Sequence, residues 1–139
     1  MENSSLFQEF GVLTELYKFY LDIVLKSVTF VLGVAGAVIA YLLKEAKTHL
    51  SAYGLFVPSI LCLGMGGGFL LSLKKAKELS VAIDSLHSKL NLVLKPHTEV
   101  LESSLLGFGI LLIVLGFIIL ISIVPITRYL KKINNNIAK

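Results

Sequence analysis

Residues 103–127 read SSLLGFGILLIVLGFIILISIVPIT, a stretch of 25 residues without a charged side chain. As a helix rising about 1.5 Å per residue, this stretch would be roughly 37 Å long, enough to cross the ~30 Å hydrocarbon core of a bilayer. Two further uncharged stretches lie upstream, at residues 27–43 and 50–73, and the apolar pattern of the first begins earlier, at Phe19. The sequence therefore predicts an all-α protein whose three transmembrane spans cover about residues 19–43, 52–73 and 104–126.

Composition favours a membrane location for the whole chain, residues 1–139, as a single membrane domain. The chain is 55% hydrophobic and 16% charged, whereas a soluble domain carries about 25% charged residues. Its net charge of +4 comes from basic residues next to the apolar stretches, such as Lys74, Lys75 and Arg128. Such side chains reach the phosphates of a membrane surface. We therefore expect membrane lipid, and not nucleic acid, as their partner.

Three crossings set the topology but not the orientation. The N-terminus and the linker of residues 74–102 share one side, whereas residues 44–49 and the basic tail of residues 127–139 share the other. Lys and Arg number seven on the first side and six on the second, so the positive-inside rule does not decide between them. The single cysteine, Cys62, excludes a disulfide within the chain.

The N-terminal segment, residues 6–20, is predicted to form a helix outside the bilayer that continues into the first span. Ser5 and Gln8 have the spacing of a capping box, which places the helix start near Leu6. Without a proline the helix could run unbroken to about Thr48, and Gly11 is the position at which a break is most expected. Four residues of alternating sign then share one helix face and form an interfacial ion-pair ladder: Glu15, Lys18, Asp22 and Lys26.

The linker carries a second pattern, an apolar seam spaced alternately by three and four residues: Ala76, Leu79, Ile83, Leu86, Leu90 and Val93. This spacing indicates either a coiled coil or an amphipathic helix in the interface plane, over residues 74–95. Lys95 and Pro96 should end that helix. The third helix then begins either after a nearly extended connection or early, at His97. We expect the linker and the N-terminal segment to pack together as an extramembrane helical layer.

Small residues recur on the faces of the predicted spans: Gly33, Gly36, Ala37, Ala40, Gly64, Gly68, Gly109 and Gly116. In lipid, close backbone approach at small residues supplies much of the packing between helices. Three spans make a thin bundle, so we expect a homo-oligomer. Three glycines follow one another at Gly66, Gly67 and Gly68, with Pro58 upstream. This run is compatible with a kink or an unwound turn that lines a pore. The alternative is a packed helix that tolerates glycine.

Chemistry-bearing patterns are sparse. The chain has no nucleophile elbow, no phosphate-binding loop and no paired carboxylates at catalytic spacing, so we expect no enzyme and no cofactor. His49 lies across the membrane from His87 and His97, which argues against a three-histidine metal site. Thr98 and Glu99, with Glu102, are better explained as residues of a helix N-terminus than as metal ligands.

The organisation of the chain, and the strings YLDIVLKSVTFVLGVAGAVIAYLL (20–43) and PHTEVLESSLLGFGILL (96–112), resemble small uncharacterised bacterial membrane proteins with few spans. The resemblance covers most of the chain and implies a multi-pass protein, most naturally of the bacterial inner membrane. It transfers no functional residue.

The leading functional hypothesis is a non-catalytic, self-assembling membrane protein, with a pore-forming or membrane-permeabilising effector as its sharpest form. One alternative is an accessory or scaffold subunit that docks a protein partner through residues 74–95. A further alternative, a holin-like lysis protein, fits the basic tail and the three spans.

Overall fold

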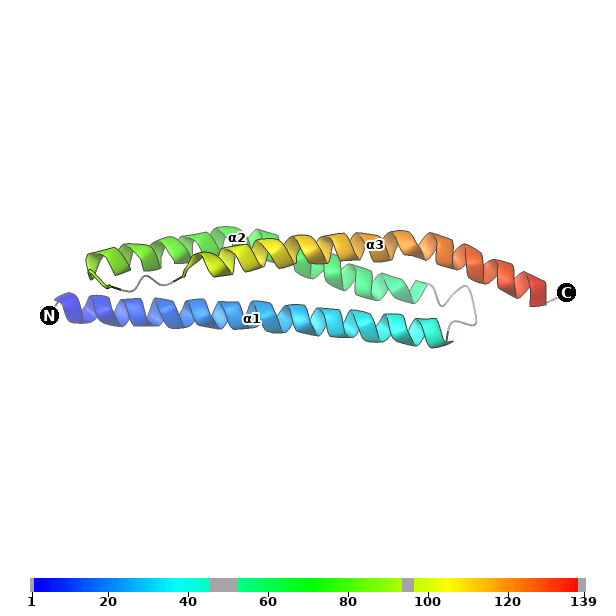
Figure 1. Ribbon diagram of the computed structural model, residues 1–139, viewed down its shortest axis with the longest axis horizontal. Coiled ribbons are helices and arrows are strands. Elements are labelled where there is room, and N and C mark those ends of the chain that lie inside the picture. Colours follow the sequence, from blue (N-terminus) through cyan, green and yellow to red (C-terminus); the bar gives the residue numbers. More distant parts are fainter. Residues whose placement is uncertain (1, 46–52, 94–96, 138–139) are drawn as a thin grey trace.

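A computed structural model describes residues 2–45, 53–93 and 97–137 (Figure 1). It contains three helices, α1 (Glu2–Glu45), α2 (Phe56–Lys89) and α3 (Glu99–Ile137), and no strand within these ranges. The predicted all-α class is confirmed. Each helix includes a segment long and apolar enough to cross a membrane.

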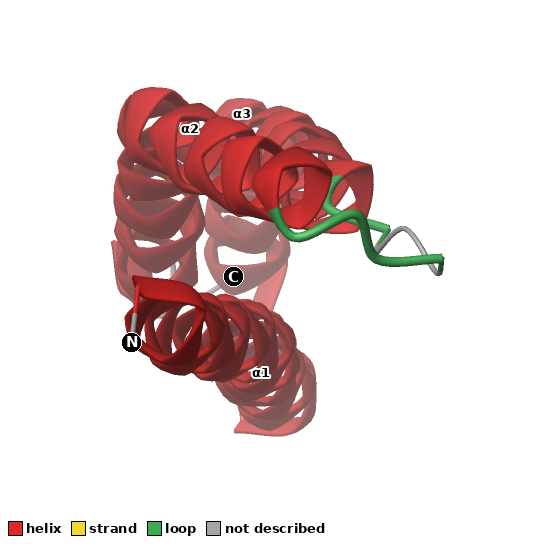
Figure 2. Cartoon of the chain, turned by 90° about the vertical axis from the view of Figure 1, so that its left-hand side faces the viewer, coloured by secondary structure: helices red, strands yellow, loops and turns green. Residues whose placement is uncertain are grey.

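The helices form an elongated bundle (Figure 1). The N-terminus, the end of α2 and the start of α3 lie toward one end, which we call the N-terminal end, and the C-terminus, the end of α1 and the start of α2 lie toward the other. Seen from the N-terminal end, α1 lies beside the α2–α3 pair (Figure 2). The most extensive contact joins α2 to α3, and α1 packs mainly on α2. Three successive crossings would leave the chain ends in this arrangement.

Helix α1 begins earlier than predicted and does not break. It starts at Glu2, so Ser5 lies inside the helix, and it continues through Gly11 to Glu45. A single glycine costs only about 1 kcal/mol relative to alanine in a helix, and no proline interrupts the backbone ladder. The predicted start near Leu6 is therefore wrong, whereas the unbroken helix that the sequence allowed is observed as far as Glu45.

Helix α2 joins the second predicted span to the linker. It runs unbroken through Gly66–Gly68, so the backbone there is helical rather than unwound. Pro58 lies in the first turn, where its missing N–H would have no partner within the helix. The bend that proline imposes deeper in a helix is therefore avoided.

Helix α2 ends at Lys89, before the predicted stop at Lys95 and Pro96. Asn91 has a φ of 48°, and the amides of Asn91 and Leu92 donate to the carbonyl oxygens of Ser88 and His87. This pair of bonds is a Schellman motif, in which a left-handed residue satisfies the last carbonyls of a helix. Lys95 and Pro96 lie outside the described residues, as does His49.

Helix α3 begins at Glu99, close to the early start at His97 that was one of the two predicted options. It continues through Pro125 to Ile137. The predicted basic tail, residues 127–139, is therefore helical for most of its length, and the helix extends about 15 Å past Arg128.

The core is a stripe of buried residues that recurs every seven positions on each helix. A seven-residue repeat keeps one face of a slightly supercoiled helix turned toward its neighbours. The members of this stripe are Tyr17, Val24 and Val31 on α1, Leu55 immediately before α2, Cys62, Phe69, Ala76 and Ile83 along α2, and Leu105, Leu112 and Ile119 on α3.

The seam predicted for the linker is the last part of the α2 stripe. Ala76, Ile83 and Leu86 are buried, and Leu79 and Leu90 are half-buried. Val93 lies past the helix end and is 99% exposed. The seam packs inside this chain, which leaves little of it free to bind another protein.

Candidate functional site

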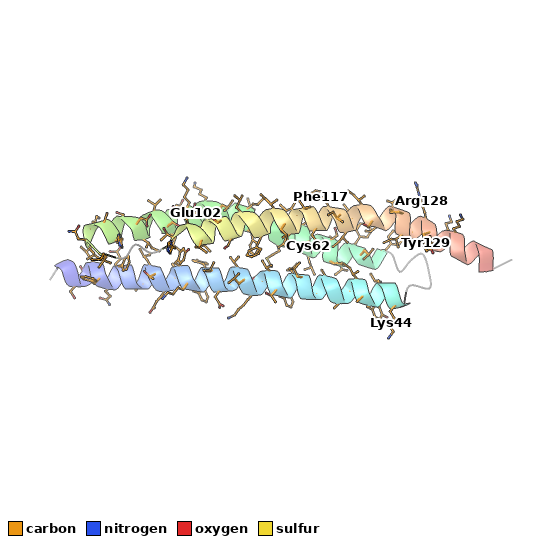
Figure 3. The ribbon with its side chains drawn as sticks, viewed as in Figure 1. Lys44, Cys62, Glu102, Phe117, Arg128 and Tyr129 are labelled. Carbon is orange, nitrogen blue, oxygen red and sulfur yellow. The ribbon has the colours of Figure 1, made fainter. Side chains whose placement is uncertain are left out.

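Helices α2 and α3 come closest at three glycines. A Cβ atom placed on Gly66 would lie 2.8 Å from the carbonyl oxygen of Gly109, and one on Gly116 would lie 2.7 Å from Cγ of Leu63. Beside them the hydroxyl of Ser59, which is fully buried, donates to the carbonyl oxygen of Gly116 at 2.9 Å. Cys62 is fully buried in the same region, midway along the bundle (Figure 3). We call this close contact between α2 and α3 the α2–α3 joint.

The predicted pair Gly64 and Gly68 does not belong to this joint. Both are exposed, and a Cβ on either would meet no atom within 4 Å. Of the predicted packing glycines, Gly109 and Gly116 lie in the α2–α3 contact. From the sequence, Gly66 is named only within the run of residues 66–68, as part of a kink or of a packed helix, and nothing local separates it from Gly64 and Gly68.

Four small residues of α1 also face away from the bundle. Gly33, Gly36, Ala37 and Ala40 are exposed, and a Cβ on either glycine would meet open space. At about 100° per residue, these positions share one face with the four residues of the predicted ladder, within an arc of roughly 100°. We call this set of eight residues the outer face of α1: Glu15, Lys18, Asp22, Lys26, Gly33, Gly36, Ala37 and Ala40.

The ladder is only partly formed within one chain. Lys26 pairs with Asp22 at 2.6 Å on the exposed surface. Across the described ranges the other ion pair joins Lys75 to Glu78, at 3.3 Å, so the expected pairing of Glu15 and Lys18 within the chain is not observed. The outer face therefore presents charges of both signs toward its surroundings.

A buried polar junction fastens the N-terminal half of α1 to the start of α3. The hydroxyl of Tyr17 donates to the carbonyl oxygen of His97 at 2.9 Å and accepts from the amide of Leu101 at 3.0 Å. Leu101 is the third residue of α3, so its amide has no partner within the helix. A tyrosine from another helix thus takes the place of an N-cap side chain. Tyr17 is not among the residues singled out from the sequence.

The same junction reaches α2. Ser80 donates to the carbonyl oxygen of Thr98 at 3.0 Å, and the Thr98 hydroxyl donates to Asp84 at 3.2 Å. The rings of Phe10 and His87 lie 6.5 Å apart, nearer the N-terminus. The N-terminal segment and the linker therefore do pack together, as predicted.

The start of α3 carries Glu99 and Glu102 in its first turn, where carboxylates favour the positive end of the helix dipole. Thr98 immediately precedes this turn, but its hydroxyl bonds to Asp84 rather than to an α3 amide. A cavity of about 760 Å³ opens beside this turn and is lined partly by His97 and Ser103. In the part of the chain that the structure describes, no three His, Cys, Asp or Glu side chains gather at metal-binding distance.

Charged residues bracket a long apolar band. Lys44 and Arg128 lie toward the C-terminal end of the bundle, and Glu102 lies toward the N-terminal end (Figure 3). Between these levels many large apolar side chains, including Phe30, Phe117 and Ile118, remain exposed. A soluble bundle would leave few such residues in contact with water.

A crevice of about 560 Å³ opens between α1 and α2 near the end of the second apolar stretch, where the described parts of all three helices contribute to its lining. Its polar groups include Tyr20, Ser72 and Lys75, and α3 contributes the buried side chains of Leu101 and Leu105.

Comparison with known proteins gives no relative. No protein-family model matches the chain, and neither a search of curated proteins nor a search of solved structures finds a significant match.

Proposed function

We propose that this protein is a non-catalytic, multi-pass membrane protein, of the bacterial inner membrane, that assembles into a homo-oligomer through the outer face of α1. The observation that carries the proposal is that the small residues of α1 face outward and pack against no other part of the described chain. In lipid, a row of small residues allows two helix backbones to approach closely, and the gain in packing drives association.

The buried residues of α1 lie on the opposite side of the helix. Tyr17, Val24 and Val31 hold that side against the bundle. The outer face of α1 is therefore the side that a second copy can reach without disturbing the fold. A two-fold symmetric contact would bring the same face of both copies together.

The charges of the outer face favour the same contact. In a symmetric pair, contact of residue i with residue j of the partner is matched by contact of j with i, so a face that carries both signs can place acid against base twice. The exposed pair of Asp22 and Lys26 would then be shared between two chains. Like charges on one helix face would instead oppose association.

A pore between copies is the sharper form of the proposal. Thr29 is exposed on the same side of α1 as the small residues, and its hydroxyl bonds to the carbonyl oxygen of Leu25 at 2.9 Å. The three apolar stretches contain no Asp, Glu, Lys or Arg. A conducting path would therefore consist of hydroxyl groups, helix backbone and apolar side chains, which close by excluding water.

Assembly is tested by replacing a small residue at the centre of the face. Gly36→Leu is compared with Gly107→Leu, because Gly107 is also exposed, a Cβ there also meets open space, and it lies on α3. The copy number in nanodiscs is counted by single-molecule photobleaching. We expect Gly36→Leu to weaken association about tenfold or more and Gly107→Leu to leave it unchanged. A monomeric wild-type protein, or equal effects of both variants, contradicts assembly through α1.

Permeabilisation is tested separately, by release of a trapped dye from liposomes at known protein density. Leakage that Gly36→Leu abolishes supports a pore between copies. Vesicles that stay tight at high protein density refute the pore. The holin-like alternative additionally requires cell lysis on overexpression, and the scaffold alternative requires a surface other than the buried seam of the linker.

A further inference from the structure

The crevice between α1 and α2 has the composition of a lipid-binding groove. One wall consists of Leu16 and Ile23 on α1, Leu79 on α2 continues the apolar lining, and Leu101 and Leu105 of α3 close its base. A cavity of about 560 Å³ falls within the range of roughly 300–1,000 Å³ that holds small ligands. It is too small for another helix, which is about 10 Å wide.

Its polar lining residues are Tyr20 on α1 and Ser72, Lys75 and Glu78 on α2. Tyr20 is 47% exposed, and the side chain of Lys75 is 84% exposed. Lys75 pairs with Glu78 at 3.3 Å, but an ammonium group has three donors and can accommodate a second anion. Lys74 and Lys77 flank the same position, so cations outnumber acids by three to one within residues 74–78.

The depth of the crevice suits a phospholipid. The second apolar stretch ends at Leu73 and would be about 36 Å long as a helix, so Lys75 lies at headgroup level if the stretch crosses the bilayer. Two turns deeper, on the same face of α2, Gly68 is exposed and leaves open space beside the helix. A chain entering at Lys75 can follow this space toward the centre of the bilayer.

We propose that this crevice binds one anionic glycerophospholipid from the surrounding bilayer, with an acyl chain against the walls formed by α1 and α2 and the phosphate at Lys75. The inference rests on the membrane placement above but not on self-assembly. Tyr20 and Ser72 provide hydroxyl groups at the level of the lipid's ester groups. Lys75, the lysine of the lining, favours an anionic headgroup over a zwitterionic one through direct contact with the phosphate.

Native mass spectrometry of the full-length protein tests the site. The protein, in mild detergent, is mixed with equal amounts of phosphatidylglycerol and phosphatidylcholine that carry the same acyl chains. We expect one phosphatidylglycerol per chain to be retained in preference. Lys75→Gln should lower this retention about fivefold. Lys77→Gln removes the same charge two residues away, outside the crevice, and should lower retention less than twofold.

A second pair of variants tests the acyl-chain groove. Ile23→Trp fills the crevice and should reduce retention of both lipids, whereas Val114→Trp, at an exposed position of α3, should not. Equal losses for Lys75→Gln and Lys77→Gln, unchanged binding by Ile23→Trp, or no retained lipid would each overturn the site. Displacement of the lipid from the crevice by a second copy of the chain would also overturn the site. The same spectra report copy number, so a monomer that retains phosphatidylglycerol supports the site and refutes self-assembly.

Discussion

Alanine substitutions at two neighbouring glycines of α2 should change stability in opposite directions. A Cβ on Gly66 would lie 2.8 Å from both the Gly109 carbonyl oxygen and Cγ1 of Ile113, so α2 and α3 would have to separate. A Cβ on Gly67 would meet no atom within 4 Å. Overpacking costs about 1–3 kcal/mol, whereas alanine in place of a helical glycine contributes about 1 kcal/mol.

The two terms give a net loss of up to about 2 kcal/mol for Gly66→Ala and a gain of about 1 kcal/mol for Gly67→Ala. The predicted gap between the variants equals the overpacking cost, about 1–3 kcal/mol, although the same atoms are added at adjacent positions. Unfolding by sodium dodecyl sulfate in mixed micelles, followed by far-ultraviolet circular dichroism, measures this gap. Gly64→Ala, also in open space, serves as a second control. Equal unfolding midpoints, or a less stable Gly67→Ala, would refute the packing argument.

Three further substitutions test other contacts of the bundle. Tyr17→Phe removes both bonds of the buried hydroxyl and should raise amide exchange at the start of α3 roughly thirtyfold, for a loss of about 2 kcal/mol; exchange equal to that of Tyr41→Phe, an exposed control, would contradict this. Ser59→Ala removes the buried bond to α3 and should cost about 1 kcal/mol in the same micelle titration, against no loss for Ser122→Ala, whose hydroxyl bonds only within its own helix. Ile83→Ala leaves a cavity at a side chain that is 1% exposed and should lower the free energy of unfolding by about 2–4 kcal/mol. Val81→Ala, at a side chain that is 60% exposed, should lower it by less than about 0.5 kcal/mol. Similar losses would show that the linker half of α2 is not packed as described.

The helical class and the approximate position of the apolar segments could be predicted from local sequence. Uncharged stretches such as residues 103–127 exceed the length that a bilayer crossing needs, and a backbone in lipid must satisfy its own hydrogen bonds. The linker seam was also predictable, because Ala76, Ile83 and Leu86 are apolar among charged neighbours. Helix ends were less accessible, since α2 stops at a left-handed asparagine, Asn91, before any proline.

What only the tertiary structure decided was which small or polar residue faces another helix. Within an apolar stretch, lipid and protein are equally hydrophobic, so the pattern of apolar residues does not distinguish a lipid-facing side from a packed one. Gly66 packs while Gly64 and Gly68 face outward, and nothing in the local sequence separates them. Likewise, the partner of Tyr17 lies 84 residues away, on α3. The sequence by itself determined how many long apolar helices the chain forms, because that depends on length and charge; their mutual rotation depends on close backbone contact, which exists only once the helices have met.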